Sequence, residues 1–251
     1  MIISHSKKFI YLHGRKTAGS SIGISLMRHL ATGDIARGYI TGGLDVGITP
    51  PDWEASSTCL RPHDFFRKSP RVHAYRRFLR KRYQVSSTHM TAQQVRDYLG
   101  EECWSSYFKF TFERNPFDRI VSFYHWRTHQ QSRPPSFEKF VEALCEEDEA
   151  FLKRNKLSGF SNLPFYLIDN EIAVDFVGRY ERLSEDVATV FQKIGLENDT
   201  WLPKNKSGIR PASASYLNYA TEAMTHKLRQ AFQTEISLFD YQPPVESRSQ
   251  G

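Results

Sequence analysis

The first hydrophobic run of the chain is short and is followed by a helical pattern. Phe9 to Leu12 are apolar and include aromatic and β-branched side chains, as in a strand. Ile22, Leu26 and Leu30 then repeat at the spacing of one helix face. A loop with two glycines at residues 13–21 separates the two patterns, so this part of the chain predicts a strand, a loop and a helix.

A second junction of the same kind lies near the middle of the chain. Phenylalanines alternate with polar residues over residues 108–112, which is typical of a strand. Asn115 and Pro116 follow, and they are favoured types for the N-cap and the first position of a helix. We expect this strand to turn into a helix over residues 112–122.

Other periodic stretches predict the remaining elements. Thr91 and Gln94 have the spacing of a capping box, and Gly100 is expected to end the helix that they begin. Residues 32–82 are broken up by glycine and proline, so we expect an irregular excursion with some helix near its end. The other expected elements are strands at 85–88, 165–168 and 172–177 and helices at 91–99, 136–145, 184–194 and 221–239.

This order of elements predicts an α/β fold in three layers, with a central, mostly parallel sheet flanked by helices. Ligands of such sheets bind at the carboxyl ends of the strands, so both junctions are expected on one edge. A chain of 251 residues with 39% hydrophobic content can bury one sizeable core. We therefore expect a single domain over residues 1–245 and a disordered tail at 246–251.

The charge balance favours an anionic ligand. Lys and Arg number 34 against 28 Asp and Glu, and the net charge of +6 is mild for a nucleic-acid-binding protein, so no nucleic acid is expected. A basic run at residues 76–82 is expected to be a solvated helix face; the alternative is an entrance for an acidic glycan.

The cysteines and the lengths of the apolar runs indicate the cellular compartment in which the chain is expected. The 3 cysteines are widely spaced and form no C-x-x-C pair, so neither a disulfide framework nor a zinc site is indicated. Lys7 and Lys8 interrupt the N-terminal apolar run, and no later run is long enough to span a membrane. We expect a soluble, cytoplasmic chain with no signal peptide and no transmembrane segment.

The first junction reads YLHGRKTAGSS and nearly matches the phosphate-binding loop of ATP and GTP enzymes. Gly14 and Gly19 have the right separation, but Ser20 stands at the lysine position and the lysine is Lys16. Backbone N–H groups, hydroxyls and the start of a helix can hold an anion there, which makes the expected fold P-loop-like. The displaced lysine and the lack of an unmistakable magnesium-binding aspartate argue against an NTPase.

The second junction supplies a candidate oxyanion clamp. Arg114 stands where the strand ends, and Ser122 lies about two turns into the helix. An arginine and a serine near a helix start are commonplace, so this pair alone is a weak signal. Together, the two junctions specify a ligand with two phosphate-type groups, as in a 3′,5′-bisphosphorylated nucleotide.

These residues resemble the PAPS-dependent sulfotransferases, in particular the branch that contains carbohydrate sulfotransferases and many bacterial relatives. HGRKTAGSS is similar to the 5′-phosphosulfate loop of that family, and FTFERNPFDRIVSFY is similar to its 3′-phosphate motif. The likeness extends over most of the chain except residues 32–82. It implies PAPS (3′-phosphoadenosine 5′-phosphosulfate) as co-substrate and PAP as product, with no metal required.

The resemblance also implies a set of nucleotide-binding residues. Gly14-Arg15 replaces the usual aliphatic-proline pair, which loosens the loop or adds a second cation, and Glu113 replaces a more common apolar residue without an evident role. The implied ligands are Arg15, Lys16, Thr17, Ala18, Gly19, Ser20 and Ser21 for the 5′-phosphosulfate, Arg114 and Ser122 for the 3′-phosphate, and Lys206 and Ser207 in a flap.

Sulfuryl transfer to a hydroxyl needs a base and positive charge near the departing phosphate. We expect Lys16 to supply the charge. His89 is the best candidate base because it follows a predicted strand, precedes a capped helix and titrates near neutral pH. A histidine at this place serves as the base in some relatives. The alternatives are a structural role for His89, and His13 as the base.

Two further signals stay open. His125 and His129 are four residues apart on the predicted helix and could bind a metal, but with no third ligand we expect a solvated or core face. Arg119 could be either a ligand or an ion-pair partner.

The expected function is transfer of a sulfuryl group from PAPS to an acceptor hydroxyl, most simply that of a glycan. The alternatives are a P-loop nucleotide kinase and a non-catalytic nucleotide- or polyanion-binding relative. Acceptor contacts are expected from residues 32–82 and 125–160, where the resemblance is thinnest.

Overall fold

The computed structural model describes residues 1–36, 89–197, 199, 201–203, 210–211 and 215–243. The expected strand at 85–88, the basic run at 76–82, the tail, and all but the start of the 32–82 excursion lie outside these residues. Two compact units are present. The first comprises Met1–Gly14, Ala18–Phe112 and Pro164–Asn205, and the second Arg15–Thr17, Glu113–Leu163 and Lys206–Gly251.

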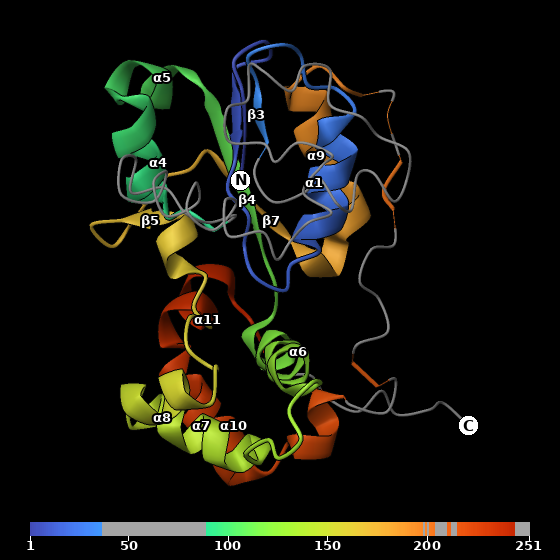
Figure 1. The fold of residues 1–251 in the computed structure, drawn as a ribbon. Helices are drawn as coiled ribbons and strands as arrows, with labels where there is room; N and C mark the ends of the chain where they lie inside the picture. Colours follow the sequence, from blue (N-terminus) through green and yellow to red (C-terminus); the bar gives the residue numbers. More distant parts are fainter. Residues whose placement is uncertain (37–88, 198, 200, 204–209, 212–214, 244–251) are drawn as a thin grey trace, which may run out of the picture. The chain divides into compact units, whose positions relative to one another are not determined.

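A five-stranded sheet forms the centre of the first unit, in the order β3-β1-β2-β4-β7 (Figure 1). Its strands are β1 (Ile2–Ser4), β2 (Phe9–Tyr11), β3 (Ile35–Ala36), β4 (Phe108–Glu113) and β7 (Phe176–Arg179). β1 pairs antiparallel with both β2 and β3, while β2 pairs parallel with β4. Because β2 and β3 both oppose β1, these two strands run in the same direction.

The remaining neighbours, β4 and β7, also run in the same direction. The N–H of Asp175, just before β7, donates to the carbonyl of Lys109 near the start of β4 at 2.9 Å. Near the other end, Gly178 lies so close to Phe112 that an added Cβ would come within 2.4 Å of the ring. Only β1 therefore opposes the other strands, and the prediction of a mostly parallel sheet is confirmed.

Helices cover both faces of this sheet (Figure 1). Phe110 and Phe112 pack with α1 (Gly19–Met27) and α9 (Leu183–Lys193) in one apolar cluster. The opposite face carries α4 (Ala92–Leu99) and α5 (Glu101–Ser106), where Lys109 Nζ lies 5.6 Å from the centroid of the Trp104 ring. The alternation of phenylalanine with polar residues in β4 thus points aromatic rings to one side and Lys109 to the other.

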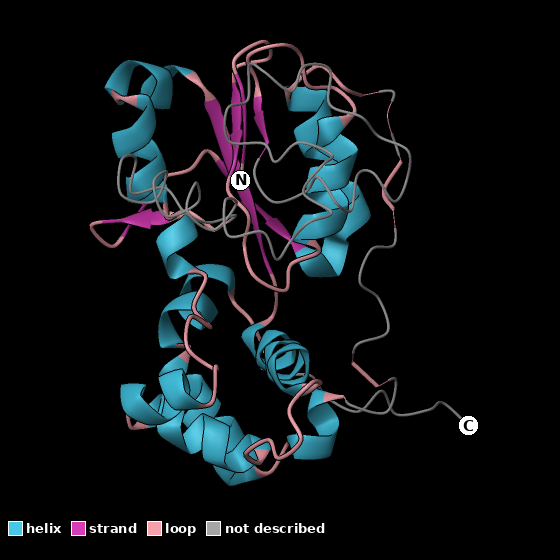
Figure 2. Cartoon of the chain, in the orientation of Figure 1, coloured by secondary structure: helices cyan, strands magenta, loops and turns pink. Residues whose placement is uncertain are grey.

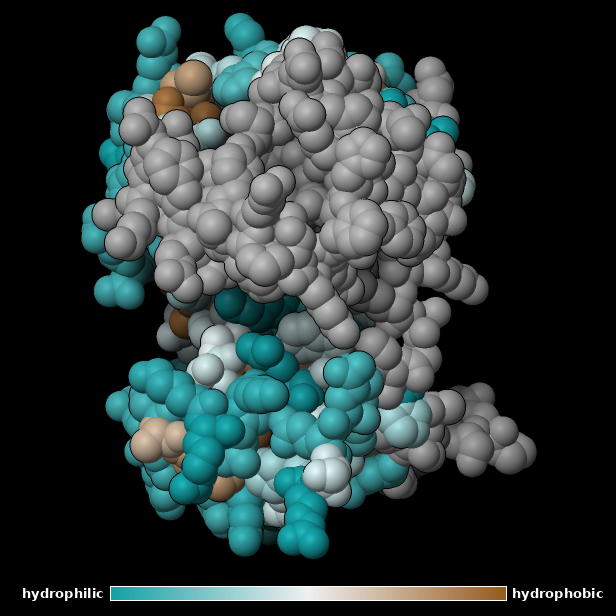
Figure 3. All heavy atoms as spheres, in the orientation of Figure 1, coloured by the Kyte–Doolittle hydropathy of each residue, from teal (hydrophilic) through white to brown (hydrophobic). Residues whose placement is uncertain are grey.

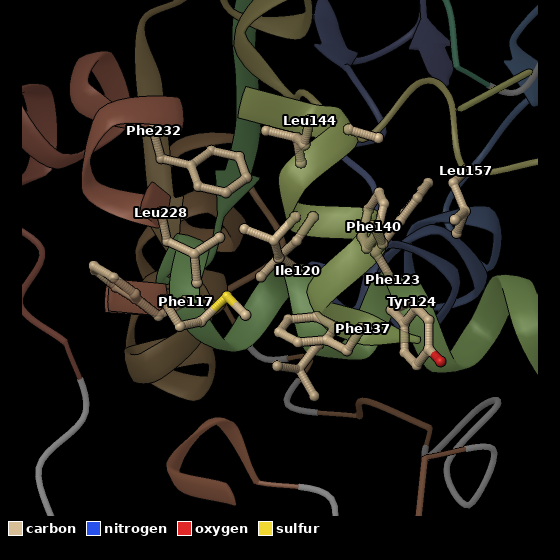
Figure 4. Packing of buried hydrophobic residues seen from close by; sticks show 14 of the residues in the cluster. Phe117, Ile120, Phe123, Tyr124, Phe137, Phe140, Leu144, Leu157, Leu228 and Phe232 are labelled. Carbon is tan, nitrogen blue, oxygen red and sulfur yellow. The ribbon is translucent and has the colours of Figure 1, made fainter. Parts of the chain in front are cut away.

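Helices joined by loops make up most of the described part of the second unit (Figure 2). An apolar cluster fills it, including Phe117, Phe140 and Leu228 (Figure 4). Its helices are α6 (Pro116–Thr128), α7 (Phe137–Cys145), α8 (Glu149–Arg154), α10 (Glu222–Ala231), α11 (Gln233–Phe239) and the 3₁₀ turn η4 (Tyr216–Tyr219).

Most helix predictions are confirmed, and the caps explain why. The Thr91 hydroxyl accepts from the N–H of Gln94 and the Gln94 side chain accepts from the N–H of Thr91, a complete capping box at the start of α4. Asn115 and Ser136 cap α6 and α7 in the same local manner. Among the strands and α-helices of the described residues, β1, β3, α5 and α8 have no counterpart in the predictions.

Three predictions are wrong in extent, namely the strands at 165–168 and 172–177 and the helix at 221–239. Asp169 and Asn170, both with positive φ, form the turn of a small hairpin of β5 (Leu167–Ile168) and β6 (Glu171–Ile172). Residues 163–165 are instead a 3₁₀ turn, η2, and β7 is separate from β6; a further 3₁₀ turn, η3 (Tyr180–Arg182), precedes α9. The expected helix at 221–239 breaks at Phe232, whose ring is buried in the apolar cluster of the second unit.

On the face drawn in Figure 3, hydrophilic residues make up most of the surface that is coloured. Among the described residues, each helix falls short of the length and apolar character needed to cross a bilayer.

Candidate functional site

The two junctions begin at neighbouring strands. β2 and β4 are paired in parallel, with Tyr11 opposite Phe110. Just beyond this pair, the N–H of Leu12 donates to the carbonyl of Phe110 at 2.9 Å, and the Thr111 hydroxyl donates to the carbonyl of Leu12 at 2.7 Å. The expectation that both strands end on the same edge of the sheet is therefore confirmed.

The loop after β2 has an unusual backbone. Lys16 and Ala18 have φ of 62° and 59°, in the left-handed region that residues with a side chain rarely adopt. Conformations of this kind persist where surrounding contacts determine them, and they are frequent at binding sites. The loop also joins the two units, since Arg15–Thr17 belong to the second and the residues on either side to the first.

In the second unit, Arg114 contacts the backbone of this loop. Its Nη1 donates to the carbonyl of Lys16 at 3.2 Å. Its Nε donates to Asp118 Oδ2 at 2.8 Å, and its Nη2 contacts the same oxygen. Asp118 also accepts from Arg210 at 2.5 Å. Burial alone would raise the pKa of Asp118, but Arg114 and Arg210 hold it below its usual value, so this carboxylate is ionised and orients both guanidinium groups.

Positive charge is concentrated around the same segment. Burial, together with the charges of Arg127 and Arg119, lowers the pKa of Arg15 to about 10. Lys16 Nζ lies 5.5 Å from the centroid of the Trp126 ring, and the guanidinium of Arg127 lies 4.8 Å from the same ring. A cation whose pKa is lowered by neighbouring cations favours an anionic ligand.

In the first unit, the start of α1 has the features of an anion-binding helix end. Its N-cap, Ala18, provides no side-chain hydrogen bond to the first turn, which consists of Gly19, Ser20 and Ser21. Gly19 also permits a close approach: a Cβ there would lie 1.9 Å from the His13 ring. His13 is thus packed against the loop, as a supporting residue would be.

His89 lies in the same unit and is half-buried. Its Nδ1 is 2.9 Å from the carbonyl oxygen of His13, and the two imidazole centroids are 4.6 Å apart. A carbonyl can only accept, so Nδ1 carries a proton, and in the neutral ring the lone pair is on Nε2. A base needs such a nitrogen.

Arg119 holds two buried carboxylates together in the second unit. Its Nε is 3.2 Å from Glu113 and its Nη2 is 3.1 Å from Glu235, and all three side chains are at most 2% exposed. Arg119 also donates to the carbonyl of Phe160. Burial and the negative charge of Glu113 raise the pKa of Glu235 to about 7 despite Arg119. Of the two roles left open for Arg119, the ion-pair partner is the one observed.

A family match over most of the chain identifies the family of the protein. The sequence matches the model of the Sulfotransferase family over residues 1–242. The chain belongs to the sulfotransferase family.

Relatives of this sulfotransferase-family chain include carbohydrate sulfotransferase 14 of Homo sapiens, 27% identical over 168 residues, and that of Danio rerio, 23% identical over 167 residues. These alignments cover 55% of this chain and 43% and 45% of the two relatives, so the chain spans less than half of their length. An Archaeoglobus fulgidus protein described as uncharacterized is 34% identical over 114 residues, which are 44% of this chain and 86% of that protein.

The structure shows direct contacts among several of the expected site residues. Arg114 reaches the Lys16 carbonyl, and His13 contacts both Gly19 and His89. Ser122 is buried in α6, four residues after Asp118. Thr17 and Ser21 are buried, while Ser20 is half-buried. The flap residues Lys206 and Ser207 lie outside the described part of the chain.

The histidine pair of α6 has other partners. His125 Nε2 is 3.2 Å from the hydroxyl of Tyr219, and burial, with the charge of Arg210, lowers the pKa of His125. His129 Nδ1 is 2.8 Å from the carbonyl of Trp126. Within the described residues, histidine, cysteine, aspartate and glutamate side chains form no group of three that could hold a metal ion.

Two contributors to the site were missed in the sequence. Asp118 orients Arg114, and its position four residues after Arg114, at a helix start, is a signal that could have indicated this pair. Asn162 binds the backbone of Arg15, 147 residues away in the chain. No local pattern marks Asn162, since the segment around it is irregular.

Proposed function

We propose that this chain transfers a sulfuryl group from PAPS to a hydroxyl of an acceptor, and that the acceptor is a carbohydrate. The observation that supports the donor most strongly is the family match over residues 1–242, which includes both the lysine loop and the arginine motif. The same proposal includes a P-loop-like role for the β2–loop–α1 segment.

The residues of the loop suit a phosphosulfate group. In this proposal Arg15, Lys16 and the hydroxyls of Thr17, Ser20 and Ser21 bind the 5′-phosphosulfate together with the backbone N–H groups at the start of α1. The lowered pKa of Arg15 supports this, because an anion would offset the repulsion that Arg127 and Arg119 exert. Ala18 and Gly19 allow the backbone to approach the ligand.

In this proposal, Arg114 and Ser122 bind the 3′-phosphate. The support is that Asp118 holds the guanidinium of Arg114 in place next to the Lys16 carbonyl. An oriented guanidinium binds a phosphate with less loss of side-chain entropy than a mobile one. The flap role of Lys206 and Ser207 is part of the proposal on family grounds alone.

The transfer itself needs a proton acceptor and a stabilised leaving group. The sulfur–oxygen bond to the 5′-phosphate breaks, a bond from the acceptor oxygen to sulfur forms, the hydroxyl proton passes to the base, and PAP leaves. We assign the base role to His89 Nε2, since Nδ1 is committed to the His13 carbonyl. Lys16 offsets the charge that develops on the bridging oxygen.

The acceptor class rests on relatives. Three of the matching proteins are named carbohydrate sulfotransferase 14, and from them we infer a glycan hydroxyl as the acceptor. The shared segment covers less than half of those proteins, so the particular sugar is not part of the proposal.

Transfer of labelled sulfate tests this function. The chain is incubated with PAPS carrying radioactive sulfate and a panel of glycans, lipids and small alcohols, and labelled products are identified by mass spectrometry. We expect Lys16→Ala to lower the transfer rate about 100-fold to 1,000-fold through lost charge stabilisation. His89→Ala should lower it about 100-fold to 10,000-fold through loss of the base.

Matched variants serve as controls. Lys8→Ala changes an exposed lysine with a similarly positive φ of 54°, and His226→Ala changes an exposed histidine of α10. Both should retain the wild-type rate. Wild-type rates in Lys16→Ala and His89→Ala would refute the assigned roles. Turnover of ATP with magnesium in place of PAPS would favour a nucleotide kinase, and PAP binding without transfer would favour a non-catalytic relative.

A further inference from the structure

The side-chain amide of Asn162 forms hydrogen bonds with the backbone of the proposed phosphosulfate loop at Arg15. Its Oδ1 accepts from the N–H of Arg15 at 2.8 Å, and its Nδ2 donates to the carbonyl of the same residue at 3.1 Å. Asn162 is fully buried and belongs, like Arg15, to the second unit. The side-chain amide thus occupies both hydrogen-bonding groups of Arg15, as a neighbouring strand would.

These two hydrogen bonds lie next to Lys16, whose backbone conformation is strained. Lys16 follows Arg15 directly and has a φ of 62°, a conformation that is costly unless its surroundings determine it. Asn162 fixes the peptide groups before Lys16, and Arg114 binds the carbonyl of Lys16 at 3.2 Å. The backbone of Lys16 is therefore held on both sides.

Glu113 determines which way the Asn162 amide points. Its Oε1 accepts from Asn162 Nδ2 at 3.1 Å and from the N–H of Arg114 at 2.8 Å. A carboxylate can only accept, so it selects the NH₂ end of the amide and leaves Oδ1 for Arg15. Arg119, shared with Glu235, offsets the charge of this buried carboxylate.

We propose that Asn162, oriented by Glu113, is a positioning residue that holds Arg15–Thr17 in the conformation that binds the 5′-phosphosulfate. This assigns a role to Glu113, for which the sequence offered none. The inference rests on the proposed function for the identity of the ligand, but the effect on the loop does not depend on any ligand.

Asn162→Ala tests the proposal with two independent measurements on the full chain. The first is amide hydrogen exchange of the peptide that contains Arg15–Thr17, without ligand, followed by mass spectrometry. We expect exchange there about 10-fold faster, because the N–H of Arg15 loses its acceptor, and little change in α7. The second is calorimetric titration with PAP, for which we expect the Kd to rise about 10-fold.

Two more variants complete the design. Asn155→Ala is the control, since the Asn155 amide donates to the carbonyl of Phe151 at the end of α8; both measurements should match the wild type. If Asn162→Ala does not fold, Asn162→Asp keeps the size but loses the donor for the Arg15 carbonyl, and repulsion from Glu113 displaces the new carboxylate from the Arg15 N–H. At pH 8, where the new carboxylate is ionised, this variant should also show faster exchange at Arg15–Thr17 and a higher Kd for PAP.

The outcomes are distinct. Unchanged exchange at Arg15–Thr17 overturns the proposal, and so does faster exchange with an unchanged Kd for PAP. Faster exchange with weaker PAP binding supports it. If the wild type does not bind PAP, the proposed function fails and the loop does not serve PAPS; exchange alone then decides whether Asn162 holds the loop.

Discussion

Arg119 is the residue on which the buried charges of the second unit depend. One guanidinium faces two carboxylates, Glu113 and Glu235, so the group carries a net negative charge when both are ionised. Burial makes that charge costly, and the raised pKa of Glu235 is the consequence. Glu113 also accepts hydrogen bonds from Asn162 Nδ2 and from the N–H of Arg114.

Glu235→Gln should therefore change how stability depends on pH. The pKa of Glu235 is raised from 4.5 to about 7 in the folded chain, so this group destabilises the fold progressively as pH rises from 4.5 through 7. The contribution lost over that window is about 3 kcal/mol in the free energy of unfolding. Glutamine keeps an acceptor for Arg119 and cannot ionise, so the variant should lose less stability than the wild type between pH 5 and 7.5.

Urea unfolding at pH 5 and at pH 7.5 measures how much stability the variant and the wild type each lose over this range. Glu222→Gln, on the exposed start of α10, is the control and should retain the wild-type dependence. An unaltered pH dependence in Glu235→Gln would show that Glu235 stays ionised over this range.

At the scale of elements, short local signals place the helix starts that follow two of the expected site residues. α4 begins three residues after His89, and its capping box involves only Thr91 and Gln94. α6 begins at Pro116, after the Asn115 cap, and carries Asp118 and Ser122. These helix starts lie directly after His89 and Arg114, so the caps restrain the backbone on one side of both residues.

Removal of the α4 cap should destabilise the protein by a modest amount. The Thr91 hydroxyl accepts from the N–H of Gln94 at 3.2 Å, and Thr91→Ala leaves that N–H without its side-chain acceptor. We expect the free energy of unfolding to fall by about 1 kcal/mol, measured by urea denaturation. Thr91→Ser keeps the hydroxyl and should cost much less; an equal loss in the two variants would contradict the capping explanation.

At the scale of the whole molecule, each of the two units has an apolar cluster of its own. The cluster of the first unit joins the sheet to α1 and α9, and that of the second joins α6 and α7 to α10. The charged groups that bind the loop segment Arg15–Thr17 are in the second unit, so its packing supports the proposed nucleotide site directly.

Leu228→Ala tests the contribution of the second cluster. Leu228 is 0% exposed, and its truncation should lower the free energy of unfolding by about 2 to 5 kcal/mol, through lost burial and a residual cavity. Leu238→Ala in α11 is the matched control, because Leu238 is 40% exposed and should cost far less. Equal losses in urea unfolding would mean that Leu228 does not contribute as a core residue.

Much of the fold could be predicted because its signals act over a few residues. The caps at Thr91, Asn115 and Ser136 were predictable since each binds an N–H only two or three residues away. The break at Phe232 was not, because it coincides with burial of that ring against the distant Phe160. β1 was missed because its pairing with β3 brings together Ile3 and Ile35.

By itself, the sequence determined the family and the candidate residues, because the lysine loop and the arginine motif are each confined to a short segment with fixed spacing. Only the tertiary structure decided how those residues are held. The Asn162 amide on Arg15, the Glu113 carboxylate on Asn162 and the His13 carbonyl on His89 join segments far apart in the chain. Such hydrogen bonds depend on where the folded backbone places each group, and no local pattern of residue types records that placement.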